Sequence, residues 1–192
     1  VKKALHAPNC LTCPGKPDIL SKKEPASATF ALNIPNLCAK CHQDGEESAI
    51  RKTASQTHIL QNYSMSIHGE GAKKSGLSVS ANCASCHTPH KVLPATDPES
   101  TVNHANISET CSNCHIGISE TLNKSIHSPG VTKTDKKLPV CNDCHSSHTI
   151  TRHDAGKFRL DIAAQCGDCH KEAMTSYFET YHGKASKLGE EN

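Results

Sequence analysis

The sequence predicts a fold of short α-helices and long loops, with little or no β-structure, wrapped around bound groups rather than around an aliphatic core. Only 35% of the 192 residues are hydrophobic, 3% are aromatic, and Trp is absent. The side chains therefore offer little apolar area, whose burial stabilises a fold by roughly 25 cal/mol per Å². The chain also holds 12 Cys and 14 His, so we expect groups bound through these residues to supply the missing interior.

The rest of the composition argues against several classes of protein. No apolar run approaches the ~20 residues of a membrane-spanning helix, so no transmembrane segment is expected. The opening V-K-K-A-L-H-A-P-N-C lacks the apolar stretch of a signal peptide, so we expect a mature or trimmed chain. The formal net charge is only +2, and no basic patch with interleaved aromatic residues occurs, so no nucleic-acid partner is expected.

Every cysteine belongs to a C-x-x-C pair, and five of the six pairs are followed directly by His. C-x-x-C-H is the attachment signature of c-type haem. The two thiols, about one helical turn apart, form thioether bonds to the vinyl groups of a porphyrin, and the adjacent imidazole takes the proximal position on the iron. Four-cysteine zinc sites and disulfides are the alternatives, but neither explains why His follows five pairs of six.

The motifs therefore predict five haem c groups and assign their attachment. Because haem c is attached outside the cytoplasm, we expect a periplasmic or extracellular location, or the cell surface of a prokaryote. The predicted thioether residues are Cys38, Cys41, Cys83, Cys86, Cys111, Cys114, Cys141, Cys144, Cys166 and Cys169, and the predicted proximal ligands are His42, His87, His115, His145 and His170.

A doubled haem unit of about 58 residues recurs along the chain. It consists of an S-I-H motif, then C-x-x-C-H-x-x-H, then a second C-x-x-C-H. We expect a degenerate first unit with a helical insertion and one haem at Cys38–His42 (1–67), two doubled haem units (68–126 and 127–181), and the start of an unfinished unit (182–192).

Two further kinds of His recur at fixed places in this unit and predict the distal iron ligands. One kind lies three residues after a proximal His, and the other follows a helical stretch in S-I-H or T-Y-H. The predicted distal ligands are His68, His90, His127, His148 and His182. Their number equals the number of haems, which favours bis-His ligation throughout. The non-recurring His6, His58, His104 and His153 are substitute candidates.

Spacing indicates which haem a distal His does not serve. The residues between His115 and His127 predict a helix, and twelve helical residues span ~18 Å at 1.5 Å each. His127 should therefore ligate a haem other than the one attached beside His115, and His182 stands in the same relation to His170. His90 follows His87 by three residues, on the same side of the chain, so it should ligate a neighbouring haem.

The first pair, Cys10 and Cys13, departs from the pattern. Alignment of the units places Pro14 where other units have the proximal His, and Pro17 where they have the distal one. We interpret this pair as a decayed haem site whose cysteines are free thiols or form a disulfide. The alternative is a sixth haem with an outside ligand, such as His6 or a residue of another subunit.

The clearest predicted helices cover about 46–65, 108–127 and 161–184. The first is rich in good helix formers and contains no Gly or Pro. Ser108, followed by Glu109, is the predicted N-cap of the second helix. Strand signals are weak throughout.

The S-x-H-G, C-x-x-C-H-x-x-H and C-x-x-C-H motifs resemble those of the doubled-CxxCH multihaem cytochromes c of anaerobic, metal- or sulfate-reducing prokaryotes. The resemblance covers nearly the whole chain and departs from the family at Pro14 and Pro17. It implies a chain of mostly bis-His, low-potential haems that carries electrons. Some relatives reduce nitrite, hydroxylamine or tetrathionate, and others polymerise into extracellular filaments.

We therefore expect an electron-transfer protein without catalytic residues, not an enzyme, with redox proteins or an extracellular acceptor as its partners. It would act as a single chain or as a homopolymer with haem ligation between subunits. The alternatives are a multihaem reductase and a fragment of a larger cytochrome. A reductase needs an open iron position, and no C-x-x-C-K motif of the nitrite-reductase kind occurs.

Overall fold

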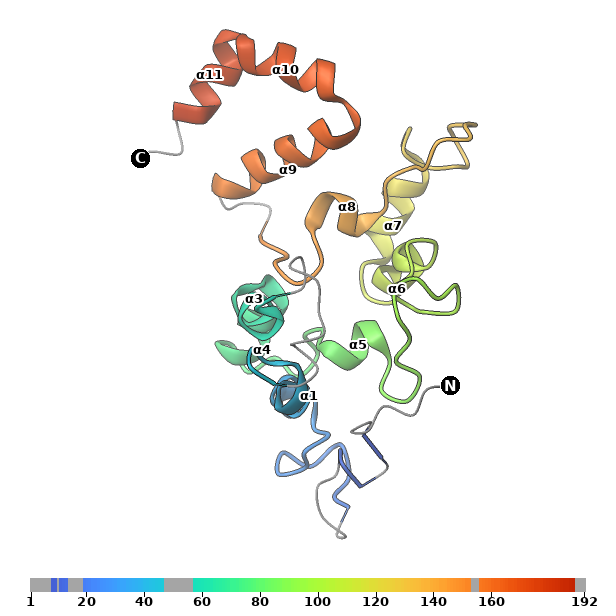
Figure 1. Cartoon of the computed structure of the whole chain (residues 1–192), viewed down its shortest axis with the longest axis vertical. Coiled ribbons are helices and arrows are strands. Elements are labelled where there is room, and N and C mark those ends of the chain that lie inside the picture. Colours follow the sequence, from blue (N-terminus) through green and yellow to red (C-terminus); the bar gives the residue numbers. More distant parts are fainter. Residues whose placement is uncertain (1–7, 10, 14–18, 47–56, 153–155, 189–192) are drawn as a thin grey trace. The chain divides into compact units, whose positions relative to one another are not determined.

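The computed structural model describes residues 8–9, 11–13, 19–46, 57–152 and 156–188 (Figure 1). Over these residues the chain consists of short helices joined by turns and loops, and it contains no strand. The predicted class of short helices and loops is thereby confirmed for this part of the chain. The chain divides into two compact units, Val1–Val92 and Leu93–Asn192. The boundaries of the sequence repeats stay a prediction.

The first unit is built around the helix that ends in the Cys38–His42 motif. This helix, α1, contacts α3 and α5, and α3 contacts α4. The bounds are η1 (a 3-10 turn) Ala31–Asn33, α1 Ile34–His42, α3 Ile59–Met65, α4 Ile67–Lys73 and α5 Cys83–His87.

The second unit is a succession of helices in which each contacts the next or the next but one. Helix α6 contacts α7 and α8, α8 contacts α9, and α10 contacts both α9 and α11. The last three are the orange-to-red helices of Figure 1. The bounds are α6 Ile107–Ser112, α7 Ile116–Asn123, α8 Cys141–His145, α9 Gly156–Cys169, α10 Lys171–Glu179 and α11 Tyr181–Leu188.

The interior of the described residues contains almost no hydrophobic side chains. Ala39 and Ile107 are the buried hydrophobic residues, and no large side chain is fully buried. The most buried polar residues are instead four serines, Ser27, Ser66, Ser100 and Ser128. The units are therefore held by local hydrogen bonds, while many large apolar side chains lie exposed.

Two loops with the same hydrogen bonds precede α1 and α6. Ser27 Oγ donates to the Leu20 carbonyl at 3.2 Å, and Asn33 Nδ2 donates to the carbonyls of Pro25 and Ser27. In the second unit Ser100, Leu93, Asn106 and Pro98 make the corresponding bonds. The positions differ by 73 residues, which is also the separation of Cys38 from Cys111. The loop that leads into the second C-x-x-C-H of a unit is thus repeated in three dimensions.

The single helix predicted over 108–127 is wrong, because it is divided at His115, which has φ −100° and ψ 51°. The His115 N–H still donates to Cys111, while its carbonyl accepts from Ser119, so this residue joins α6 to α7. The predicted N-cap is also wrong: Asn106 precedes α6, and Ser108 lies inside it.

The other two predicted helices are also interrupted. The region 161–184 contains α9, α10 and α11, and His170 (φ −112°, ψ 49°) joins the first two as His115 does. Of the region 46–65, residues 47–56 lie outside the described part, and α3 begins only at Ile59. No described helix is both long and apolar enough to cross a membrane.

Candidate haem-attachment sites

The C-x-x-C-H motifs occur in two structural settings. Cys83–His87 and Cys141–His145 each form a complete five-residue helix, α5 and α8. The other three motifs stand at the C-terminal ends of α1, α6 and α9. In a helix, residues i, i+3 and i+4 share one face, so in the motifs that are helical throughout, those of α1, α5 and α8, both thiols and the imidazole project to the same side.

The two five-residue helices are capped by a residue of the motif itself. In α5, Ser85 Oγ accepts from the Asn82 N–H at 3.1 Å, and Asn82 Oδ1 accepts from the Ala84 N–H. In α8, Asp143 Oδ2 accepts from the Val140 N–H at 2.9 Å. These bonds satisfy N–H groups that a short helix would otherwise leave unpaired. The second variable position of the motif thus fixes the conformation in which both thiols project together.

A left-handed residue follows the proximal His in both copies of C-x-x-C-H-x-x-H. Thr88 has φ 60° and Ser146 has φ 59°, a region that residues other than Gly seldom occupy. Thr88 Oγ1 donates to the Lys91 carbonyl at 2.9 Å, and Ser146 Oγ bonds Thr149 Oγ1 at 2.8 Å. The chain therefore turns sharply between each proximal His and the predicted distal His three residues later.

A hydroxyl two residues before the distal His bonds the end of the preceding helix in all three copies of the second kind of distal His. Ser66, Ser125 and Thr180 donate to the carbonyl three residues earlier at 2.6, 2.7 and 2.6 Å. Ser66 and Thr180 also accept from the N–H of Gly69 and Gly183 at 3.1 Å. The recurring [S/T]-x-H pattern is the sequence signal for this geometry, and its hydroxyl is a site residue that the prediction of distal ligands did not include.

Glycine after the distal His is required where a helix restarts. A Cβ on Gly69 would lie 1.9 Å from the Tyr63 carbonyl oxygen, and one on Gly183 would lie 2.2 Å from that of Tyr177. The second copy has Ser128 at this position, and residues 124–132 form turns instead of a helix. The surroundings of His127 therefore differ from those of His68 and His182.

Thiols of consecutive motifs meet within each unit. In the first unit the Cys38 and Cys83 thiols are hydrogen-bonded, which lowers the pKa of Cys38 to about 7 and raises that of Cys83. In the second unit a hydrogen bond with Cys111 lowers the pKa of Cys141 to about 6. In both cases the second motif of one repeat contacts the first motif of the next, so the two attachment sites are adjacent.

A third pair of motifs, Cys141–His145 and Cys166–His170, is adjacent at the C-terminal end of α8. Burial raises the pKa of Cys144, and the nearby Cys166 and Cys169 thiols raise it further. The pKa of His145 is lowered by partial burial and by the proximity of His115, and its ring stacks on Phe158 with centroids 5.6 Å apart. The three motifs of the second unit thus follow one another in space in the order of the sequence.

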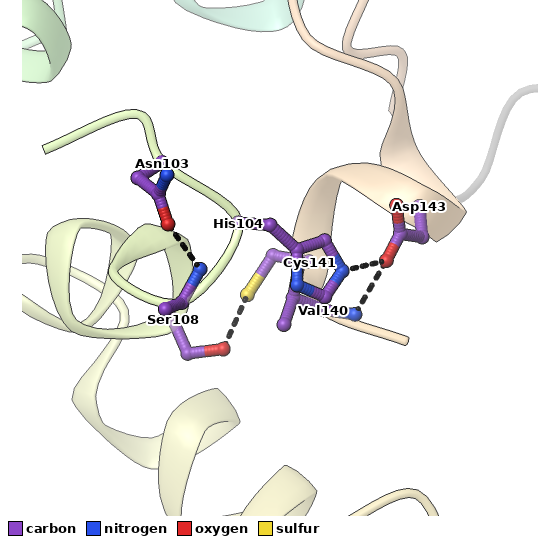
Figure 2. A network of polar contacts seen from close by, with 7 residues as sticks. Asn103, His104, Ser108, Val140, Cys141 and Asp143 are labelled. Atoms are coloured by element: carbon purple, nitrogen blue, oxygen red, sulfur yellow. Dashed lines mark hydrogen bonds and ion pairs between the residues drawn. The ribbon is translucent and has the colours of Figure 1, made fainter. Parts of the chain in front are cut away.

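Each of the two thiol–thiol contacts is accompanied by a polar side-chain bond between the same two segments, which Figure 2 shows for the second unit. His104 Nε2 bonds Asp143 Oδ2 at 2.8 Å, and the Cys141 thiol lies 3.9 Å from Ser108 Oγ. In the first unit the corresponding bond runs from Asn82 Nδ2 to the Ala31 carbonyl at 3.2 Å. His104, a substitute ligand in the sequence analysis, therefore contributes to docking through its Nε2.

The remaining predicted site residues are placed as follows. His87 is half-buried, and burial lowers its pKa, which favours the neutral imidazole that binds metals. His58 Nδ1 contacts the Asp44 carboxylate. His90 and His182 are exposed, while His68 and His148 are half-buried. All described cysteines are free thiols. His6, Cys10, Pro14, Pro17 and His153 lie outside the described residues.

The ring of one predicted distal His lies beside the ring of a predicted proximal His. The ring centroids of His127 and His170 are 6.3 Å apart, with an angle of 46° between the ring planes. Among the described residues, no group of three or more His, Cys, Asp or Glu is arranged to hold a metal ion. Haem iron takes its axial ligands from only one or two side chains. A pair of neighbouring imidazoles, and not a larger cluster, is therefore the arrangement expected at a haem.

Comparison of the chain with known protein families, with curated proteins and with solved structures finds no match.

Proposed function

We propose that the protein is a multihaem c-type cytochrome that carries electrons along a row of about five closely packed bis-His haems in the periplasm or outside the cell. The observation that carries the proposal is the contact between thiols of consecutive C-x-x-C-H motifs in each unit. Five such motifs by themselves predict five haems. Contact between motifs adds that neighbouring haems would lie close enough to exchange electrons.

The residues of the chain have three tasks in this function. The paired thiols attach each porphyrin through thioether bonds, and the adjacent imidazole ligates its iron. Haem c supplies the one-electron iron couple. The second imidazole closes the remaining iron position to substrates, which favours electron transfer over catalysis.

Exposed apolar side chains beside the motifs support this proposal. Ile116 and Ile118 follow the Cys111–His115 motif and are 62% and 67% exposed, and Ile126, beside His127, is 70% exposed. In the proposed protein they would cover the apolar porphyrin faces.

The proposal includes assembly into a homopolymer. His182 is held by Thr180 as His68 is held by Ser66, and it is exposed. It would then ligate a haem of another copy. Size-exclusion chromatography and negative-stain imaging of native material should show polymers that the substitution His182→Ala shortens or abolishes. Polymers unchanged by this substitution would contradict ligation by His182.

Intact-mass measurement and absorption spectroscopy test the haem assignment. We expect the mass of the native protein to exceed that of the chain by five haem groups. The ferric and ferrous spectra should be of low-spin haem and should not change with cyanide or carbon monoxide. A colourless protein, or zinc in place of iron, would exclude the proposal, and a large high-spin fraction would favour a reductase.

A further inference from the structure

The imidazole rings of His127 and His170 lie beside each other, and the distance between their centroids suits one metal ion between them. Imidazole nitrogen binds a metal ion at about 2 Å, and the ring centre lies roughly 1 Å behind that nitrogen, so two rings on opposite sides of one ion have centres about 6 Å apart. The observed separation is 6.3 Å. A plain aromatic contact falls in the same range, but here the two backbones are each held in place by bonds of their own.

The backbone of His170 is fixed at the joint between α9 and α10. Its N–H donates to the Cys166 carbonyl at 2.8 Å, and its carbonyl accepts from the Met174 N–H at 3.0 Å. The imidazole therefore stays beside the cysteines of its own motif, Cys166 and Cys169, which are exposed.

The backbone of His127 is fixed independently of His170. Its N–H donates to Ser125 Oγ at 3.2 Å, and the next turn is closed by Thr132 Oγ1, which donates to the Ile126 carbonyl at 2.5 Å. No hydrogen bond between the two histidines is needed to bring the rings together. The path of the chain alone brings the two rings together.

In both of these motifs a helix separates the proximal His from the distal His that follows it in the chain. Helix α10 has nine residues and separates His170 from His182 by about 14 Å along its axis. Helix α7 has eight residues and separates His115 from His127 by about 12 Å. His127 is therefore separated from the motif that precedes it in sequence, while its ring lies beside that of the last motif.

We propose that His127 and His170 are the two axial ligands of one iron, that of the haem attached at Cys166 and Cys169. This assignment rests on the proposed function, and it names a pairing that the motifs alone leave open. The bond would tie the turn at 124–132 to the joint between α9 and α10.

The substitution His127→Met in the holoprotein tests the pairing. Replacement of one His by Met raises the potential of a haem, so a redox titration should show one of the five haems shifted upward and four unchanged. Lys124→Met, an exposed residue of the same turn, is the matched control and should shift none. Intact mass should give five haems in each variant.

A second background identifies which haem responds. The double substitution Cys166→Ser/Cys169→Ser should give a four-haem protein in which His127→Met shifts no potential. If one of the four still shifts, His127 ligates another iron and the pairing is wrong. A map of the native holoprotein by electron cryomicroscopy tests the pairing without a variant. The two Nε2 atoms should lie on opposite faces of one haem, each bound to its iron. Native material that contains no haem at all would instead contradict the proposed function.

Discussion

At the scale of single residues, the thiols are the most strongly perturbed groups of the chain. Each of the two thiol–thiol hydrogen bonds contains one thiol with a lowered pKa, and in the first unit its partner has a raised pKa. The thiolate is the reactive form of cysteine. In the haem-free chain the two members of a contact should therefore react differently with an alkylating reagent.

Alkylation of the haem-free chain tests this prediction. The pKa of Cys141 is about 6, so its thiolate predominates at pH 7 and is lost as the pH falls through 6. Cys141 and Cys38 should label with iodoacetamide near neutral pH, whereas Cys83 should require a higher pH. Peptide masses at a series of pH values give the order. Ser108→Ala removes a hydrogen bond to Cys141 and should slow its labelling at pH 6–7; Cys83 labelling before Cys38 would contradict the assignment.

Glycine beside the helical distal His gives a second prediction at this scale. In Gly69→Ala or Gly183→Ala the new Cβ would overlap a backbone carbonyl oxygen, and overpacking typically costs about 1–3 kcal/mol. Chemical denaturation of the holoprotein should show this loss. Gly117→Ala is the control, since its Cβ would meet nothing within 4 Å and Ala favours a helix. Equal stability of all three variants would refute the close approach.

At the scale of helices, hydroxyl caps and short docking bonds fix the elements. Ser66 and Thr180 each bond the end of one helix and the start of the next. Asp143 bonds the N-terminus of α8 and also His104 of the preceding loop. These few polar side chains orient helices that have little apolar surface to pack.

The contact of Asp143 predicts a dependence of stability on pH. Burial tends to raise the pKa of this carboxyl group, but the Val140 N–H and His104 outweigh it and hold the pKa below its usual range. The contribution to stability is therefore complete above the unfolded pKa of about 4, and it is lost as the pH falls through the lower folded value. Asp143→Asn should be less stable than the parent at pH 6, and the difference should shrink toward pH 3. A difference independent of pH would argue against the charged contact.

At the scale of the whole molecule, the scarcity of buried hydrophobic side chains governs stability. Among the described residues, Ala39 and Ile107 are the buried hydrophobic residues, and no large side chain is fully buried. The haem-free chain should therefore unfold at a much lower temperature than the holoprotein when both are followed by circular dichroism. A cooperative, high-temperature transition of the haem-free chain would show that the side chains suffice.

Haem counting tests the first C-x-x-C pair. If Cys10 and Cys13 form a decayed site, Cys10→Ser/Cys13→Ser should retain five haems by intact mass. Cys38→Ser/Cys41→Ser is the matched control and should retain four. A parent with six haems that falls to five in the first variant would establish the sixth-haem alternative.

Much of the fold class could be predicted because it follows from composition. Few apolar residues and many Cys and His predicted short helices without an aliphatic core, and the described residues agree. The helix boundaries could not be predicted. Residues 108–127 have helix-forming sequence throughout, but His115 adopts a non-helical ψ of 51°, and local propensity does not include a break imposed by the path of the chain.

The sequence by itself determined the five C-x-x-C-H motifs, their repeat and the poverty of the apolar core, because attachment chemistry and composition are local properties. Only the tertiary structure decided which thiols meet, that His104 docks on Asp143, and that the ring of His127 lies beside that of His170. These residues lie far apart in sequence, and their proximity depends on the turns between them. Those turns are set by a few hydroxyl caps and left-handed residues, which motif spacing does not record.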